Sequence, residues 1–177
     1  MRPTGLAIAI ASLLVTGPAR AEEGEWRAGG QVGYATSTLG PRQGGGPAAF
    51  ATGSYGVTEA LSLKLRGGYS RHGLDADAKR KLTEGTSQVW LGSLGVEYTL
   101  DVLVVVPTFE LGVGYTHIAE DGRQPASELL LLAGVGLDYL WSRQWTVGLG
   151  AQYHVLLTDP GRTPVYVAFG PRLAYLF

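Results

Sequence analysis

Hydrophobic and polar residues alternate with a period of two along most of this chain. From Trp145 to Leu157 every second residue is apolar, whereas the positions between them carry mainly glycine, threonine, glutamine and histidine. The same alternation recurs from Val165 to Phe177. Because successive side chains of a β-strand point to opposite faces, this period predicts strands with one apolar face.

The alternation predicts an all-β chain of eight strands. Their ranges are 26–36, 48–57, 61–69, 90–100, 105–117, 129–141, 145–157 and 165–177. The second strand has the weakest pattern, because Phe50 and Tyr55 fall on opposite faces. We therefore expect either a β-bulge within this strand or a register that the pattern does not fix.

Short and long connections alternate between the predicted strands. Tight turns are expected at 58–60, at Asp101 and at 142–144. Longer segments rich in glycine, proline and charge occupy 40–47, 71–87, 119–127 and 158–164. Short turns at one end and longer loops at the other are typical of an antiparallel up-and-down barrel.

The two faces of the strands differ in composition. The apolar face carries aromatic residues eight positions apart, such as Trp145 and Tyr153, and eight residues of a tilted strand rise roughly 20 Å. That rise is close to the ~25 Å apolar band of a membrane barrel, so the aromatics are predicted to lie at the two lipid interfaces. The interfacial set is Trp26, Tyr34, Trp90, Tyr98, Tyr139, Trp141, Trp145 and Tyr153. The alternative is a soluble barrel whose aromatics form the core.

The opposite face is rich in glycine, alanine, serine and threonine, which suits a narrow enclosed lumen. Since an open sheet edge would leave backbone groups unpaired in lipid, we predict a closed eight-stranded antiparallel transmembrane β-barrel.

Composition excludes several other classes of protein. The 177 residues contain no cysteine, only 16% charged residues and 45% hydrophobic ones, which argues against a disulfide scaffold or a disordered chain. The formal net charge of -1 leaves no basic field for binding nucleic acid.

The first 21 residues resemble a secretory signal rather than part of the fold. Arg2 supplies a positive start, an apolar run extends over 6–15, and Ala19-Arg20-Ala21 forms a small-x-small cleavage site. We expect residues 1–21 to be removed and 22–177 to form the barrel domain. The apolar run is too short to span a bilayer.

The ending Val165-Tyr-Val-Ala-Phe-Gly-Pro-Arg-Leu-Ala-Tyr-Leu-Phe177 resembles the last strand of small eight-stranded outer-membrane barrels of Gram-negative bacteria, the OmpA/OmpX and OmpW type. The resemblance implies that Leu173, Tyr175 and Phe177 form the signal read by the barrel-assembly machinery. It also implies a location in the outer membrane, contact with outer-membrane lipid and a monomeric state. Pro171 departs from the pattern, so a bulge or weak pairing is expected there.

Charged residues at inward positions form the main candidate site. Three cations and three anions face the lumen by parity: Lys64, Arg66, Glu97, Glu110, Asp138 and Arg172. All are expected near the short-turn end except Glu110, which should lie higher. Buried charges are costly unless paired, so we predict a neutral ion-pair network that plugs the barrel. Paired carboxylates acting as acid and base are disfavoured, because the cations would keep both ionised.

A second inward set is apolar and is expected above the charged one. It comprises Val89, Leu91, Leu130, Leu132, Leu156 and Tyr166. Two interpretations remain open: packing that fills the lumen, or a mouth for a small hydrophobic molecule, as proposed for OmpW-like barrels.

Other motifs suggest no catalytic residue, metal or cofactor. The glycine pairs around Val135 and Leu149 lie inside strands, and Asp75 and Asp77 near His72 lack the spacing of a calcium loop. His154 faces inward without the serine that lipid A deacylases place two residues later. The sequence favours a non-enzymatic structural or surface-contact protein; a hydrophobic passage is the alternative, and a lipid-modifying enzyme is a distant third.

Overall fold

The computed structural model describes residues 23–38, 44–74, 85–100, 105–121, 124–157 and 165–177. These residues form eight strands: β1 (Trp26–Ser37), β2 (Gly44–Gly56), β3 (Leu61–Leu74), β4 (Gly85–Thr99), β5 (Val105–Glu120), β6 (Ala126–Leu140), β7 (Trp145–Leu156) and β8 (Val165–Leu176). None of the described residues belongs to a helix long and apolar enough to cross a bilayer. The predicted signal segment, 1–21, lies outside the described residues.

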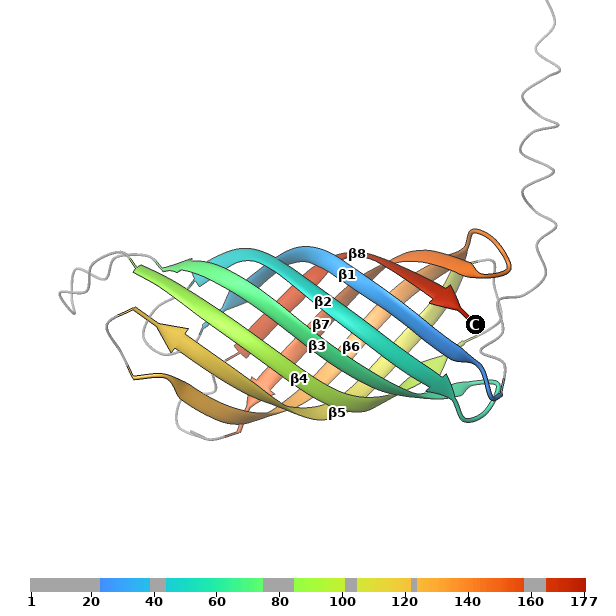
Figure 1. Cartoon of the computed structure of the whole chain (residues 1–177), viewed down its shortest axis with the longest axis horizontal. Helices are drawn as coiled ribbons and strands as arrows, with labels where there is room; N and C mark the ends of the chain where they lie inside the picture. Colours follow the sequence, from blue (N-terminus) through green and yellow to red (C-terminus); the bar gives the residue numbers. More distant parts are fainter. Residues whose placement is uncertain (1–22, 39–43, 75–84, 101–104, 122–123, 158–164) are drawn as a thin grey trace, which may run out of the picture.

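The strands close into an antiparallel barrel (Figure 1). Each strand pairs with the next in sequence, and β8 returns to pair with β1. The predicted fold class is therefore confirmed. The strands are inclined to the long axis of the barrel, and the β2–β3 and β6–β7 turns lie at the same end as the C-terminus (Figure 1). We call this the short-turn end and the opposite one the long-loop end.

The two described turns at the short-turn end share one construction. Thr58 Oγ1 accepts hydrogen bonds from the backbone N–H groups of Ala60 and Leu61, at 3.3 and 3.0 Å. Ser142 Oγ likewise accepts hydrogen bonds from the backbone N–H groups of Gln144 and Trp145, at 3.4 and 3.2 Å. A hydroxyl residue that bonds its own turn holds it closed without a longer loop. Both turns were predicted; the third, at Asp101, lies outside the described residues.

The strands reach further toward the long-loop end than the sequence indicated. Positions 44–47, 71–74, 85–87, 119–120 and 126–127 were predicted as loops and belong to strands. The ladder continues through them, as the pairs Gly44–Leu74 and Leu74–Gly85 show. Glycine and charge suggested loops here, but cross-strand hydrogen bonding outweighs these local preferences.

The bulge expected in β2 is absent. Both of its ladders run without a shift in register, from Trp26–Tyr55 to Ser37–Gly44 with β1 and likewise with β3. Phe50 points into the lumen and is 6% exposed, whereas Tyr55 points outward and is 37% exposed. Their opposite faces are simply the two faces of a regular strand.

Pro171 weakens pairing on one side without causing a bulge. The β7–β8 ladder passes through Leu149–Pro171 in constant register. The β1–β8 ladder lacks the two pairs that would join Val32 to Pro171 and Gly33 to Gly170. A proline has no N–H to donate, which accounts for weak pairing at this position.

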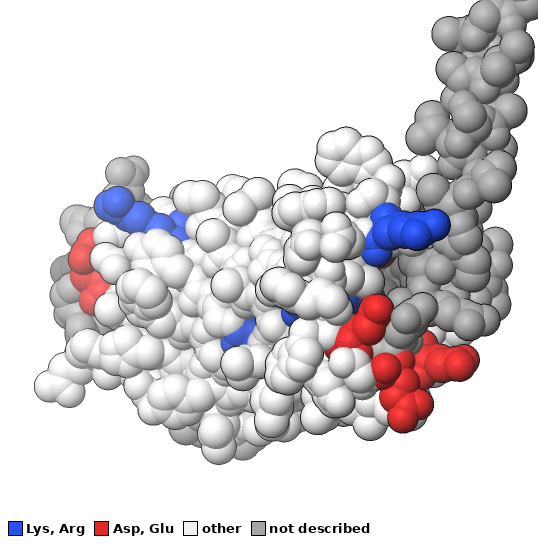
Figure 2. All heavy atoms as spheres, turned by 45° about the vertical axis from the view of Figure 1, so that its right-hand side comes forward, with Lys and Arg blue, Asp and Glu red and all other residues white. Residues whose placement is uncertain are grey.

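The apolar face points outward, as predicted. Trp145, Leu149 and Tyr153 on β7 are 42%, 62% and 46% exposed. Figure 2 shows that most charged side chains on this face gather at the two ends, with a band between them in which only small patches of Lys or Arg are visible. The polar face therefore lines the enclosed lumen.

Candidate functional site

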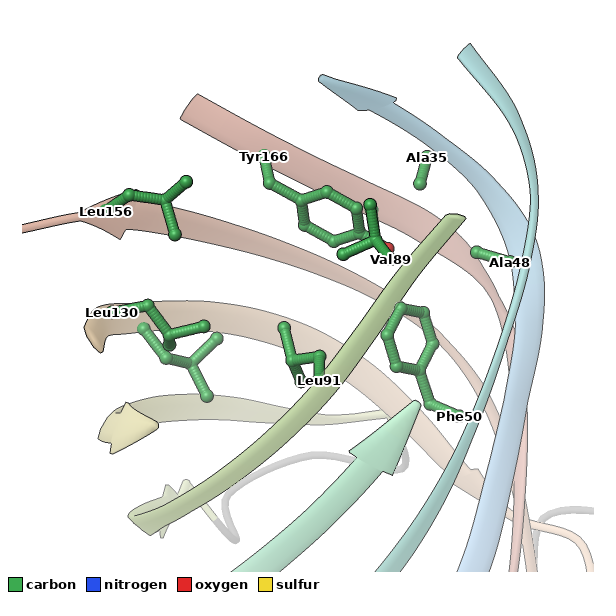
Figure 3. Close-up of a cluster of buried hydrophobic side chains, with 10 residues drawn as sticks. Ala35, Ala48, Phe50, Val89, Leu91, Leu130, Leu156 and Tyr166 are labelled. Carbon is green, nitrogen blue, oxygen red and sulfur yellow. The ribbon is translucent and has the colours of Figure 1, made fainter. Parts of the chain in front are cut away.

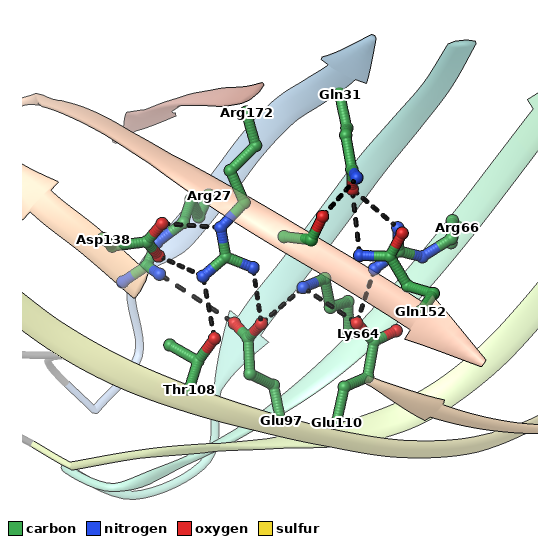
Figure 4. A network of polar contacts seen from close by, with 11 residues as sticks. Arg27, Gln31, Lys64, Arg66, Glu97, Thr108, Glu110, Asp138, Gln152 and Arg172 are labelled. Atoms are coloured by element: carbon green, nitrogen blue, oxygen red, sulfur yellow. Dashed lines mark hydrogen bonds and ion pairs between the residues drawn. The ribbon is translucent and has the colours of Figure 1, made fainter. Parts of the chain in front are cut away.

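Strand parity directs the six predicted charged residues into the lumen. Lys64 and Arg66 on β3 are 6% and 2% exposed, and Glu97 on β4 is 2% exposed. Glu110 on β5 and Asp138 on β6 are similarly buried, while the Arg172 side chain on β8 retains 14% exposure. The structure thus brings all six together within one layer (Figure 4).

The centre of this layer joins β3 to β4 and β5. Lys64 Nζ donates a short hydrogen bond to Glu97 Oε2 and lies 3.2 Å from Glu110 Oε2. Arg66 Nη2 donates to the same Glu110 oxygen at 2.5 Å. Glu110 was expected higher in the lumen, but it stands directly opposite Glu97 in the β4–β5 ladder. The β4–β5 register is centred between residues 103 and 104, beyond the predicted turn at Asp101, and this places Glu110 at the level of Glu97.

A second group joins β8 to β6 across β7. Arg172 holds Asp138 with two bonds, Nε to Oδ1 at 2.5 Å and Nη2 to Oδ2 at 2.6 Å. Gly148 lies between them in the ladder, paired with both. A Cβ on Gly148 would lie 2.2 Å from Asp138 Oδ1, so a larger residue would block this bidentate pair. The glycines of the lumen therefore make room for ion pairs.

Three further polar residues complete the charged layer and were not predicted. Arg27 Nη1 lies 4.0 Å from Glu97 Oε1. Gln31 Oε1 accepts bonds from Arg66 Nη1 at 3.3 Å and from Gln152 Nε2 at 3.0 Å. All three occupy inward positions of β1 and β7. The same parity rule would have found them.

The apolar set forms a second layer toward the long-loop end. All six predicted members are buried, and Leu130 is only 1% exposed. They pack with Phe50 and with three inward alanines that were not predicted: Ala35, Ala48 and Ala168 (Figure 3). Phe50 lies over Gly68, where a Cβ would come within 2.1 Å of its ring. Small residues on some strands thus accommodate large ones on their neighbours.

A buried polar cluster interrupts the apolar layer. His72, predicted in a loop, lies within β3 and is 0% exposed. Its Nε2 lies 2.8 Å from Ser70 Oγ, which accepts a bond of 3.1 Å from the Tyr166 hydroxyl. His154 approaches the same Tyr166 ring edge-on at 5.1 Å. The sequence missed this cluster because β3 continues beyond its predicted end.

Ser70 and His72 are the residue types of a catalytic nucleophile and its base, but both side chains are buried. Both side chains are at most 1% exposed. In this arrangement the serine oxygen is shielded from solvent. Among the described residues, no group of three or more His, Cys, Asp or Glu side chains could hold a metal ion. Asp75 and Asp77, which the sequence analysis discounted as a calcium loop, lie outside the described residues.

Comparison with known proteins identifies the family. The sequence model of the family described as outer membrane protein beta-barrel domain matches residues 6–171. The chain belongs to this family. The beta-barrel is thus a protein of the bacterial outer membrane, with lipid around its apolar band. A search of curated proteins found no match.

Solved structures similar to this outer-membrane barrel share its fold. Neisserial surface protein A (NspA) aligns with a TM-score of 0.68 at 12% identity, covering 88% of this chain and 100% of that one. OprG from Pseudomonas aeruginosa gives 0.62 at 14% identity, with 88% and 97% covered. Ail, the attachment invasion locus protein of Yersinia pestis, gives 0.61 at 14% identity, with 88% and 99% covered. At these identities the likeness extends to the fold alone.

The aromatic residues predicted at the lipid interfaces lie on the outer surface of the barrel. Trp26, Trp141 and Trp145 are 61%, 66% and 42% exposed near the short-turn end, where Tyr98 and the half-buried Tyr139 also lie. Toward the long-loop end, Tyr34, Trp90 and Tyr153 are 46%, 54% and 46% exposed. Tryptophan and tyrosine favour the boundary between hydrocarbon and headgroups.

The terminal strand presents its predicted assembly residues outward. Leu173 and Phe177 are 44% and 72% exposed. The Tyr175 ring lies 4.9 Å from that of Phe177 and 5.0 Å from that of Trp145. The Phe177 N–H also donates to the Trp26 carbonyl at 2.9 Å, which ties the end of the chain to the start of β1.

At the long-loop end, an exposed carboxylate links β4 to the end of β5. Asp121 Oδ2 accepts hydrogen bonds from Thr86 Oγ1 at 2.7 Å and from the Thr86 N–H at 3.0 Å. These two bonds, the hydroxyl bond first, hold the pKa of Asp121 below its ordinary value. While its carboxylate is ionised, Asp121 therefore links the end of β5 to the start of β4 at the rim of the barrel.

Proposed function

We propose that this outer-membrane barrel is a non-enzymatic structural protein whose lumen is sealed by its own side chains, and that its long-loop end serves surface contact. The observation that carries the proposal is the charged layer, in which each of the six predicted residues lies against an opposite charge. An eight-stranded lumen is just wide enough to be filled in this way.

The charged layer leaves little room for hydrated ions. A cavity within it has a volume of about 30 Å³, and a second one beside it, at the short-turn rim, has a volume of about 10 Å³. The larger corresponds to the space of one or two water molecules. A steady ionic current would require the Lys64–Glu97 or Arg172–Asp138 contacts to break, which uncovers charges in a confined space.

The apolar layer supports packing over a passage for small hydrophobic molecules. Leu130, Leu132 and Leu156 are 1%, 3% and 4% exposed. They form one cluster with Phe50 and Tyr166, contributed by strands on different sides of the barrel (Figure 3). A ligand entering here would have to displace side chains that already contact one another.

A surface-contact role follows by analogy with similar folds. NspA is a surface protein by name, and Ail is an attachment invasion locus protein whose crystal structure contains the heparin analogue sucrose octasulfate. We infer that the long-loop end of this barrel likewise meets molecules outside the cell. We further infer that residues 1–21 direct secretion, that Leu173, Tyr175 and Phe177 are read during assembly, and that the barrel acts as a monomer.

Two measurements test the sealed lumen. One is the ionic current of the refolded barrel in a planar bilayer, and the other is the uptake of an apolar dye by vesicles that contain it. We expect neither steady current nor uptake. Leu130→Lys should fail to fold because it buries a charge in the apolar layer, whereas the volume-conserving Leu130→Met should fold normally. Steady current, or a folded Leu130→Lys barrel that has lost a wild-type uptake activity, would contradict the proposal.

A further inference from the structure

The outer surface of the barrel carries a groove within its apolar band. It has a volume of about 1310 Å³ and is lined by residues of every strand except β6, most of whose side chains point outward. Its floor is a row of small, exposed residues that pair directly from strand to strand, namely Gly30, Ala51, Gly67 and Gly92. Leu173 on β8 and Tyr115 on β5 continue this row and close its two ends.

On β3 and β4 the groove is a slot one residue wide. The outward neighbours of Gly67 and Gly92 along their strands are all large: Leu65, Tyr69, Trp90 and Leu94. The Tyr69 and Trp90 rings contact each other, with centroids 4.5 Å apart, and form the wall toward the long-loop end. No described atom lies within 4 Å of a Cβ position at Gly67 or Gly92. The slot is therefore open to the membrane between apolar walls.

The groove runs obliquely across the apolar band, because the strands themselves are inclined (Figure 1). Leu173 lies near the short-turn end of β8, Gly92 in the middle of β4 and Tyr115 in the long-loop half of β5. Neighbouring strands lie ~4.8 Å apart, so the five steps from β8 to β5 span roughly 24 Å. With strands tilted by about 40°, the row rises by roughly 15 Å, which is half of a ~30 Å hydrocarbon core. One leaflet of the bilayer has this depth.

The two ends of the groove differ in polarity. At the long-loop end His117 lines the groove, and its Nδ1 lies 2.8 Å from Ser127 Oγ. At the short-turn end the groove is lined by Leu173 and by the rings of Trp145 and Tyr175, whose centroids are 5.0 Å apart. Hydrogen-bonding groups at one end and apolar walls along the rest suit a molecule with one polar end and a linear hydrocarbon tail.

We propose that this groove holds one acyl chain of a bilayer lipid, whose polar end lies at His117 and Ser127 in the leaflet at the long-loop end. The groove is continuous with the outward apolar band, which lies in lipid because the protein is an outer-membrane barrel. A chain in the slot contacts side chains on both of its flanks, whereas a chain on the convex surface contacts them on one side only. The added contacts retain this lipid longer than those around the rest of the barrel.

A second copy of the barrel fits the groove less well than a lipid chain. Small residues on a membrane-facing surface allow two backbones to approach closely, as the floor at Gly30 and Ala51 would permit. On β3 and β4, however, the Tyr69 and Trp90 rings stand between the floor and any convex partner. A linear chain enters a slot one residue wide, whereas another barrel rests on its walls.

Native mass spectrometry of the refolded barrel measures whether a lipid stays bound. The barrel is released from mixed micelles of detergent and palmitoyl-oleoyl phosphatidylcholine, and one lipid per barrel should be retained once the detergent is removed. A phosphatidylcholine that carries a photoreactive diazirine at the methyl end of one chain reports the position. In vesicles of palmitoyl-oleoyl phosphatidylcholine, this probe should label β1 or β8 near Leu173, where the chain ends.

Matched glycine variants locate the site. Gly92→Leu fills the slot without meeting other described atoms, so it should fold normally, lower the retained fraction about tenfold and abolish the labelling. Gly67→Leu should act in the same way from the neighbouring strand. Gly53→Leu adds the same side chain at an equally open outward position of β2 that does not line the groove, and it should leave both readouts unchanged.

Three results would overturn the proposal. A wild-type barrel that retains no lipid would mean that the groove meets only exchanging membrane lipid. Retention and labelling that persist in folded Gly92→Leu and Gly67→Leu barrels would place the lipid elsewhere. A wild-type dimer that Gly92→Leu separates would assign the groove to a second copy.

Discussion

Glu97 is the residue on which the charged layer depends most. Its carboxylate accepts a bond from Lys64 and lies 3.7 Å from Arg172 and 4.0 Å from Arg27. Three cations from three strands therefore share one buried anion. Its parity was evident from the sequence, but its partners were not, because two of them, Arg27 and Arg172, come from the first and last strands of the chain.

Replacing Glu97 with alanine should destabilise the barrel by about 3–5 kcal/mol, since it leaves buried cations without their anion. Urea titration of the refolded barrel in detergent measures the change. Glu59→Ala, at an exposed position of the β2–β3 turn, is the matched control and should change stability by less than about 0.5 kcal/mol. A Glu97→Ala effect as small as the control would mean that water, and not this carboxylate, solvates the cations.

Among the elements, the β1–β8 seam closes the barrel and is a place where two backbones approach each other closely. A Cβ on Gly170 would lie 2.0 Å from the Val32 carbonyl oxygen, and one on Gly33 would lie equally close to that of Phe169. The ladder is interrupted at the same place, next to Pro171. The sequence predicted weak pairing from the proline, but the need for glycine depends on the distance between two strands at opposite ends of the chain.

Gly170→Ala should therefore weaken closure and cost about 1–3 kcal/mol, because the added methyl group meets backbone that cannot move aside independently. Gly67→Ala is the control, since nothing lies within 4 Å of its Cβ position. The fraction of barrel that resists unfolding by detergent on a heated gel reports closure for both variants. Equal heat resistance would show that the seam has room to relax.

For the whole molecule, the outward apolar band is the feature that requires a membrane. Leu149 is 62% exposed and lies between the exposed residues Trp145 and Tyr153 on β7. Burying this face in lipid accounts for a surface that would otherwise be insoluble. On the face seen in Figure 2, most charged side chains lie at the two ends.

Leu149→Arg should destabilise the barrel in lipid bilayers by about 2–4 kcal/mol, the cost of an arginine at mid-membrane depth. Leu157→Arg, at the long-loop end of the same face, should cost no more than about 1 kcal/mol. Reversible unfolding from vesicles in guanidinium chloride measures both. Equal effects at the two positions would place the membrane band elsewhere.

The sequence by itself determined the strands, their two faces and hence the closed barrel, because side-chain parity is a local property with a period of two. Parity also directed the six predicted charges into the lumen, although Arg27 was missed. Only the tertiary structure decided which of them meet: Arg66 reaches Glu110 across β4, and Arg172 reaches Asp138 across Gly148. Such contacts depend on the register of every strand pair and on closure of the barrel. A one-residue shift in the register of any strand pair would turn the inward side chains of one strand to the outer face. The local sequence pattern therefore cannot specify which charges meet.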